Sequence, residues 1–139
     1  MAPLGEGRSM IIGLAGKNRL SKGSCAIHLL QRRKYSIAPP EFDCQAYVLR
    51  YRKLGLRICV ADVRTEADAT FLREQGGIVV HVIAPRDTHC PVSEIAIQSG
   101  DFVLHGCSDN PIAMHEQLDR IVLDHELEKL TEARHAAAR

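Results

Sequence analysis

The chain has few aromatic residues and no long apolar stretch. Aromatic side chains make up 4% of its 139 residues and tryptophan is absent, so the flat surfaces on which single-stranded nucleic acids stack are scarce. No apolar run approaches the length that spans a bilayer, and the first residues lack the apolar core of a signal peptide. These absences argue against a membrane protein and against a stacking nucleic-acid binder, and they predict a cytoplasmic protein.

Paired cysteine spacings are also missing. Five cysteines are present, an odd number, and none forms Cys-x-x-Cys, which fits reduced thiols that pack in the interior. His89-Cys90 and His105-Gly106-Cys107 offer four possible zinc ligands near expected strand ends, which leaves open a metal-supported nucleic-acid binder. Buried or incidental side chains explain the same residues more simply.

Apolar segments alternate with helical patterns along the chain. This alternation predicts one α/β domain over residues 10–139, after a flexible arm over residues 1–9: a three-layer sandwich with a small parallel sheet of about four strands. The expected strands are Met10–Leu14, Leu56–Ala61, Ile78–Ile83 and Asp101–His105. Helices are expected over Lys22–Arg33, Phe42–Leu54, a segment capped by Thr65, and Pro111 to about Ala133, with Asn110 as the cap of the last.

The last expected helix carries two apolar stripes. The stripe expected to pack on the sheet consists of Met114, Leu118, Ile121 and His125. The second consists of Leu123, Leu127 and Leu130. Two interpretations remain open: one wide buried face, or a surface that meets a partner such as a second copy of the chain.

Charge is unevenly distributed although the net charge is only +1. Residues 1–64 hold 12 Lys and Arg against 4 Asp and Glu, and residues 65–139 hold 6 against 13. A basic half suits a phosphorylated or polyanionic partner. The alternative is that the acidic half neutralises it, within the chain or across a dimer.

A phosphate-binding loop is the sharpest prediction from the residues. The apolar run Met10–Leu14 leads into Gly16, and Lys22-Gly23-Ser24 follows at the start of an expected helix. Strand, loop, lysine with hydroxyl, and helix is the layout in which backbone N–H groups and a helix N-terminus hold phosphate. Ser21 stands where the usual pattern has its second glycine, and Gly23 separates lysine from hydroxyl. An ordinary strand–turn–helix is the alternative.

Asp62 and Arg64 extend this prediction. They follow an apolar strand, and open parallel sheets bind ligands at the carboxyl ends of their strands. If the chain is a kinase, Asp62 would hold Mg²⁺ together with Ser24, and Lys22 and Arg64 would neutralise the phosphates of ATP. The alternative for Asp62 and Arg64 is a salt-bridged pair.

Several segments together resemble the deoxynucleoside monophosphate kinases of bacteriophages. Gly16-Lys17 and Lys22-Gly23-Ser24 are similar to that family's loop, Gly-Lys-x-x-x-Gly-Lys-Asp-Thr. The segment 58–64 is similar to its strand ending in Asp-Val-Arg, and residues 66–82 to the helix and strand that follow. His89 with Ser93-Glu94, and residues 101–104, continue the likeness in the same order.

The resemblance implies a P-loop kinase core that binds ATP and Mg²⁺. Catalytic roles would fall to Lys22, Asp62 and Arg64, and metal binding to Ser24 and Asp62. Nucleotide contacts would come from Gly16, Lys17, Ser21, Lys22, Gly23 and Ser24. Only residues 25–57 separate the loop from the Asp-Val-Arg strand, so the family's insertion with its lid is missing.

Two functions are therefore expected. The first is a reduced nucleotide-binding protein in which phosphate transfer from ATP is left open. The second is a phage-derived pseudoenzyme that keeps the kinase fold and binds and inhibits a host protein.

Overall fold

A computed structural model describes residues 10–39, 43–83, 95–106 and 110–138. Its sheet has five strands, all parallel, in the order β2-β3-β1-β4-β5. The strands are β1 (Ile11–Ala15), β2 (Ser36–Ile37), β3 (Ile58–Val60), β4 (Ile78–Ile83) and β5 (Phe102–His105). The predicted α/β class with a parallel sheet is confirmed, with one strand more than expected. The predicted arm, residues 1–9, and the possible ligands His89, Cys90 and Cys107 lie outside the described residues.

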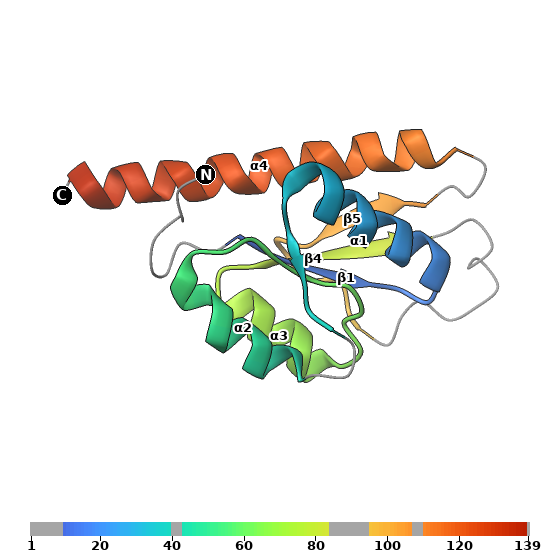
Figure 1. Cartoon of the computed structure of the whole chain (residues 1–139), viewed down its shortest axis with the longest axis horizontal. Helices are drawn as coiled ribbons and strands as arrows, with labels where there is room; N and C mark the ends of the chain where they lie inside the picture. The colour runs from blue at the N-terminus through green and yellow to red at the C-terminus, as the bar shows by residue number, and fades with distance from the viewer. Residues whose placement is uncertain (1–9, 40–42, 84–94, 107–109, 139) are drawn as a thin grey trace.

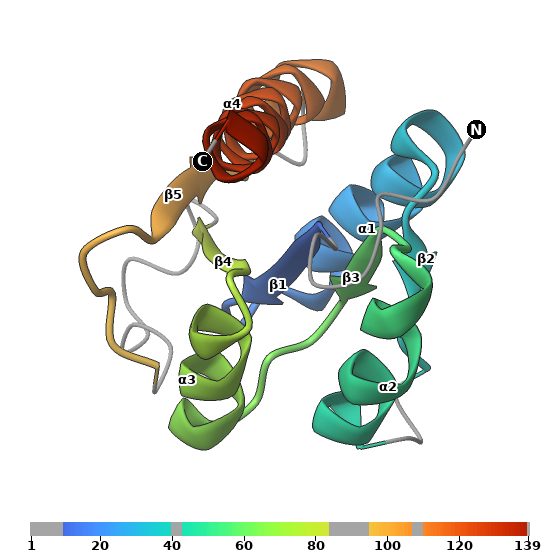
Figure 2. The same ribbon diagram turned by 90° about the vertical axis from the view of Figure 1, so that its left-hand side faces the viewer.

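Helices cover both faces of the sheet, so that helices, sheet and helices form three layers (Figure 2). They are α1 (Arg19–Arg33), α2 (Cys44–Tyr51), the short 3₁₀ helix η1 (Arg52–Leu54), α3 (Glu66–Glu74) and α4 (Pro111–Ala138). Helices α1 and α4 pack on one face of the sheet, and α2 and α3 pack on the other (Figures 1 and 2).

Polar side chains fix where the helices begin. The Asn18 side chain accepts a hydrogen bond from the Ser21 N–H at 2.9 Å, so α1 begins at Arg19, before the expected Lys22. Thr65 and Asn110 cap α3 and α4 in the same way, as their sequence positions predict.

Strand β2 was not expected from the sequence. It contains only two residues, Ser36 and Ile37. Pro39 and Pro40 follow shortly after it in the sequence, and prolines interrupt regular secondary structure. Strand β2 forms because it pairs with β3, where Ser36 N–H donates to the Arg57 carbonyl at 2.7 Å and Ala38 N–H to that of Cys59 at 2.9 Å. Two residues are too few to show a strand periodicity, which is why only the tertiary structure reveals this edge.

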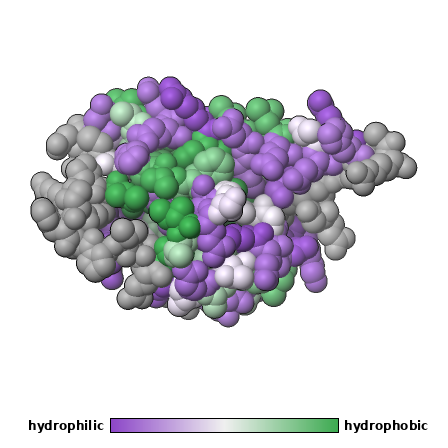
Figure 3. Space-filling view, turned by 180° about the vertical axis from the view of Figure 1, so that it is seen from behind, coloured by the Kyte–Doolittle hydropathy of each residue, from purple (hydrophilic) through white to green (hydrophobic). Residues whose placement is uncertain are grey.

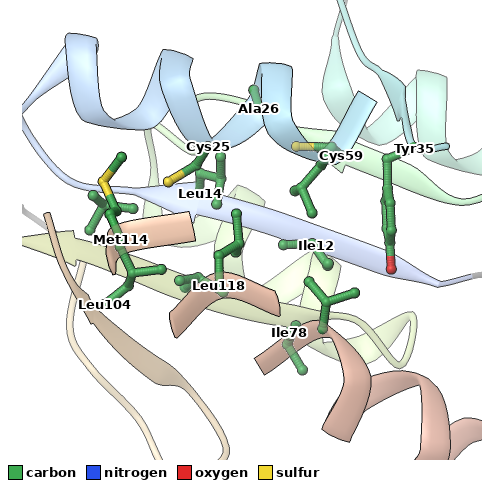
Figure 4. Close-up of a cluster of buried hydrophobic side chains, with 14 of the residues drawn as sticks. Ile12, Leu14, Cys25, Ala26, Tyr35, Cys59, Ile78, Leu104, Met114 and Leu118 are labelled. Atoms are coloured by element: carbon green, nitrogen blue, oxygen red, sulfur yellow. The ribbon is translucent and has the colours of Figure 1, made fainter. Parts of the chain in front are cut away.

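The larger core lies between the sheet and the α1–α4 layer (Figure 4). Ile12 and Leu14 of β1 point into it, and Leu29 and Leu118 meet them from the two helices. Cys25 and Cys59 are buried and unpaired, and burial raises the pKa of each thiol to about 12. These two cysteines therefore pack as small apolar side chains, as predicted.

Helix α4 buries only one of its two apolar stripes. Met114, Leu118 and His125 are buried, and Ile121 is half-buried. Leu123, Leu127 and Leu130 remain 44%, 60% and 47% exposed. The interpretation as one wide buried face is therefore wrong for this stripe. The C-terminal part of α4 also extends beyond the sheet (Figure 1).

Helix α4 also covers part of the outer edge of β5. The Gln117 side chain accepts from the His105 N–H and donates to the His105 carbonyl, both at 3.2 Å. The Gln117 side chain thereby occupies the N–H and the carbonyl of His105 as a neighbouring strand would. Another strand therefore cannot pair with β5 at His105. Seen from the side of β5, apolar surface gathers in one area that borders polar surface (Figure 3).

We expect Gly16→Ala to destabilise the protein and Gly23→Ala to stabilise it. Gly16 has a φ of +132°, and an added Cβ would lie 2.3 Å from the Val82 carbonyl oxygen, so both backbone strain and a clash arise. Gly23 lies inside α1, and no heavy atom of the described residues lies within 4 Å of an added Cβ. Urea unfolding should show a loss of about 2 kcal/mol or more for the first and a gain of about 0.5–1 kcal/mol for the second. If Gly16→Ala left the free energy of unfolding unchanged, that result would contradict the backbone conformation described for Gly16.

His125 should make the fold sensitive to acid. Burial, with Lys129 adding to its effect, lowers the pKa of His125 to about 4, and its Nε2 has no hydrogen-bond partner among the described residues. The unfolded chain binds this proton near pH 6.5, so stability is full above that pH and falls as the pH drops toward 4. Between neutral pH and about pH 5, wild type should lose about 2 kcal/mol more than His125→Leu does. The exposed His135 on the same helix is the control, and His135→Leu should follow wild type.

Candidate functional site

A cavity of about 350 Å³ opens at the carboxyl edge of the sheet. It lies beside the ends of β2 and β3 and the first turns of α1. The chain leaves β1 toward α1 on one face of the sheet and leaves the adjacent β3 toward α3 on the other. Adjacent strands whose connections diverge in this way form the crevice where open α/β sheets bind ligands. The position of the cavity is therefore that of a typical ligand site.

One wall of the cavity is cationic. Lys22 is buried, and its Nζ lies 2.5 Å from Asp62 Oδ1, while Arg64 Nε lies 3.0 Å from Asp62 Oδ2. Burial alone would raise the pKa of Asp62, but the hydrogen bonds from Lys22 and Arg64 outweigh it and lower that pKa. Arg19 is exposed on the same wall and forms no ion pair with any residue that the structure describes. The wall thus holds three cations and one carboxylate.

The opposite wall carries Asp43, Cys44 and Asp68. A ligand atom of each lies within 4.8 Å of the other two. Asp43 caps α2 by accepting from the Gln45 N–H, and the Gln45 side chain donates to Asp68 at 3.0 Å. Burial, together with the two carboxylates, raises the pKa of Cys44 to about 12, so its sulfur stays a neutral thiol. The sequence predicted a helix from Phe42, whereas α2 begins at Cys44 with Asp43 as its cap, and it gave no sign that Asp43 lines a cavity.

The connection from β1 to α1 is short. Only Gly16, Lys17 and Asn18 separate them, because α1 already begins at Arg19. The residues predicted to form the phosphate loop are therefore helical from Arg19 onward. Lys22 and Ser24 are two positions apart on this helix, and residues so spaced point in different directions.

Ser24 accordingly faces α4 and not the cavity. Its Oγ lies 2.8 Å from His115 Nε2, whereas both Asp62 oxygens are bonded to Lys22 and Arg64. The structure does not bring Ser24 and Asp62 together around one ion. The donor set predicted for Mg²⁺ therefore does not fit, and no step through Mg²⁺ is derived.

The other predicted residues divide between the cavity and its surroundings. Gly16 sits against Val82, Lys17 is exposed, and Ser21 is buried beside Gly106. Those that line the cavity are Lys22, Gly23, Asp62 and Arg64.

A second polar cluster links α1 to α4. The His115 ring stacks on His28 with 4.3 Å between centroids, and His28 Nε2 lies 2.9 Å from Asp119. Burial lowers the pKa of His115, and the charge of His28 adds to the effect. This cluster was not predicted from the sequence. Its signal was the spacing of four residues from Ser24 to His28 and from His115 to Asp119, which puts each pair on one helix face.

Some of the basic half of the chain is neutralised by the acidic half. Arg33 Nε lies 3.0 Å from Asp119, and Arg57 Nε lies 3.1 Å from Glu126. The predicted intramolecular neutralisation is therefore confirmed for these two pairs. The cations of the cavity wall are paired differently, with Asp62 or with none of the described residues.

Comparisons with protein-family models, with curated proteins and with solved structures found no match. Within the part of the chain that the structure describes, no helix is both long enough and apolar enough to cross a bilayer. The function proposed below therefore rests on the geometry of the cavity.

Removing the Asp62 carboxylate should destabilise the fold. Asp62→Asn leaves the Lys22 ammonium buried without its anion, and we expect a loss of about 1–2 kcal/mol in the free energy of unfolding at neutral pH. The pKa of Asp62 is lowered in the folded state, so its contribution is present above the unfolded value and disappears as the pH falls through the folded one. The difference between variant and wild type should therefore shrink in acid.

Arg64→Ala is the matched control for this ion pair. The Arg64 side chain is mostly exposed, so losing it should cost less than about 0.5 kcal/mol. Equal losses for the two variants, or a difference that is independent of pH, would contradict a buried Lys22–Asp62 pair.

Proposed function

We propose that this cavity binds one phosphorylated small molecule, with the phosphate on the wall formed by Arg19, Lys22 and Arg64. The observation that carries the proposal is this group of three cations around a cavity at a ligand-binding position of the sheet. Arginine and lysine together suit phosphate, because guanidinium groups bond its oxygens in pairs and ammonium adds a compact charge.

We propose a nucleotide as the ligand. The resemblance to phage deoxynucleoside monophosphate kinases supports this class, as do the strand–turn–helix with Lys22 and the Asp62-Val63-Arg64 segment after β3. A P-loop kinase-like core is part of the same proposal. The parallel sheet with helices on both faces is consistent with it, but one fold hosts many functions.

The proposed role is binding without efficient phosphate transfer. A volume of about 350 Å³ is near the lower end of ligand pockets, so it accommodates one ligand, whereas transfer needs a donor and an acceptor together. Ser24 is engaged by His115, which removes the hydroxyl expected on Mg²⁺. ATP is thus proposed as a ligand and not as a phosphate donor.

Asp62 would compete with the incoming phosphate. With no ligand it neutralises Lys22 and Arg64, and a phosphate would take over part of that role. Binding should therefore weaken as the phosphate becomes less charged. The role as an inhibitor of a host protein stays a prediction from the sequence, since none of the described residues points to a host protein.

Calorimetric titration tests the proposal. ATP and the deoxynucleoside monophosphates should each be titrated with and without Mg²⁺, and we expect binding that does not depend on Mg²⁺. Lys22→Met should abolish binding, and Arg19→Ala should weaken it about tenfold, the loss expected for one charge-assisted hydrogen bond.

The control for the charge is Arg32→Ala. Arg32 is exposed on the same helix but lies outside the cavity, so its loss should leave the affinity unchanged. Circular dichroism should show that all variants remain folded. The absence of heat for every nucleotide would overturn the proposal, and so would an equal effect of Arg19→Ala and Arg32→Ala.

A further inference from the structure

The outer side of α4 carries a row of side chains that no described residue covers. We call this row the α4 seam; it consists of Glu116, Arg120, Leu123, Leu127, Leu130 and Arg134. All six are exposed, and the three charged members form no ion pair with the described part of the chain. The seam faces away from the stripe of Met114, Leu118 and His125 that packs on the sheet.

The spacing of the seam is that of a helix–helix contact. Its members follow one another at intervals of four, three, four, three and four residues, so they lie along a single line on the helix. Three leucines occupy the middle of the line and charged residues occupy its ends. Leucines at such spacing bury their side chains against a second helix.

The residues of the seam can pair with the seam of a second copy that runs in the opposite direction. When two copies of α4 run antiparallel and cross at the level of His125, Leu123 lies opposite the second copy's Leu127. At the same crossing, Glu116 lies opposite the second copy's Arg134, and Arg120 lies beside its Leu130. The crossing point is also the middle of α4, Pro111–Ala138, so the two helices overlap along their whole length.

Helix α1 adds apolar surface beside the seam. Leu20, Ile27 and Leu30 are exposed on it, and Leu20 is 85% exposed. Helices α1 and α4 lie side by side on the same face of the sheet (Figure 2), joined by the bonds of His28 and Ser24. Leu20 and Ile27 line one hollow with Glu116 of the seam, together with polar side chains of both helices.

We infer that two copies of this chain associate through the α4 seam in an antiparallel, twofold-symmetric dimer. Charge complementarity favours a second copy of the chain as the partner. The symmetric arrangement brings Glu116 opposite Arg134 twice, and Leu123 opposite Leu127 twice. A parallel arrangement would place Glu116 against Glu116 and Arg134 against Arg134. This dimer is independent of the proposed nucleotide site, which lies at the carboxyl edge of the sheet.

Sedimentation equilibrium of the full chain tests the inference. Wild type should be a dimer, and Leu127→Glu should raise the dissociation constant at least about tenfold, because it places two charges in the apolar middle of the seam. Leu123 lies opposite the second copy's Leu127 and is 44% exposed, and Leu49 on α2 is 47% exposed, so Leu123→Glu and Leu49→Glu form a matched pair. Only the first should weaken the dimer.

A charge exchange tests the antiparallel direction. Glu116→Arg alone and Arg134→Glu alone should each weaken the dimer, and the double variant should recover the wild-type dissociation constant. A monomeric wild type would overturn the inference, as would a dimer that tolerates Leu127→Glu or weakens equally with Leu49→Glu. Failure of the double variant to recover would overturn the antiparallel arrangement. Circular dichroism of each variant shows whether the helices persist.

Discussion

The hydrogen bond from the Ser21 N–H to the Asn18 side chain sets the geometry of the candidate site. It starts α1 immediately after a three-residue turn, which fixes the direction of every later side chain on that helix. Lys22 is thereby directed toward Asp62 and Ser24 toward His115. This cap thereby separates a charged group at the sheet edge from a polar contact between helices.

The same separation explains why binding is a better proposal than transfer. The cavity carries positive charge in Arg19, Lys22 and Arg64, which the proposed binding of phosphate would use. Ser24 bonds His115 and Asp62 bonds Lys22, so the hydroxyl and the carboxylate expected around a metal ion lie apart. Electrostatic attraction is sufficient for holding an anion, while catalysis requires the reacting groups to be held in a defined mutual geometry.

The inner and outer sides of helix α4 have different roles. Its inner side closes the larger core and covers the edge of β5 at His105, which accounts for its buried residues and for Gln117. Its outer side carries leucines that add nothing to that core. These leucines are exposed because their side of the helix faces away from the sheet, and the C-terminal part of α4 extends beyond the sheet (Figure 1).

The sequence by itself determined the elements whose signals are local. Apolar runs predicted β1, β3, β4 and β5, and polar caps at Thr65 and Asn110 predicted two helix starts, because both effects depend on neighbours within a few residues. The pairing of β2, the salt bridge of Lys22 with Asp62 and the contact of Ser24 with His115 join residues far apart in the chain. Only the tertiary structure decided these, since no local pattern records which distant side chain a given helix turn will face.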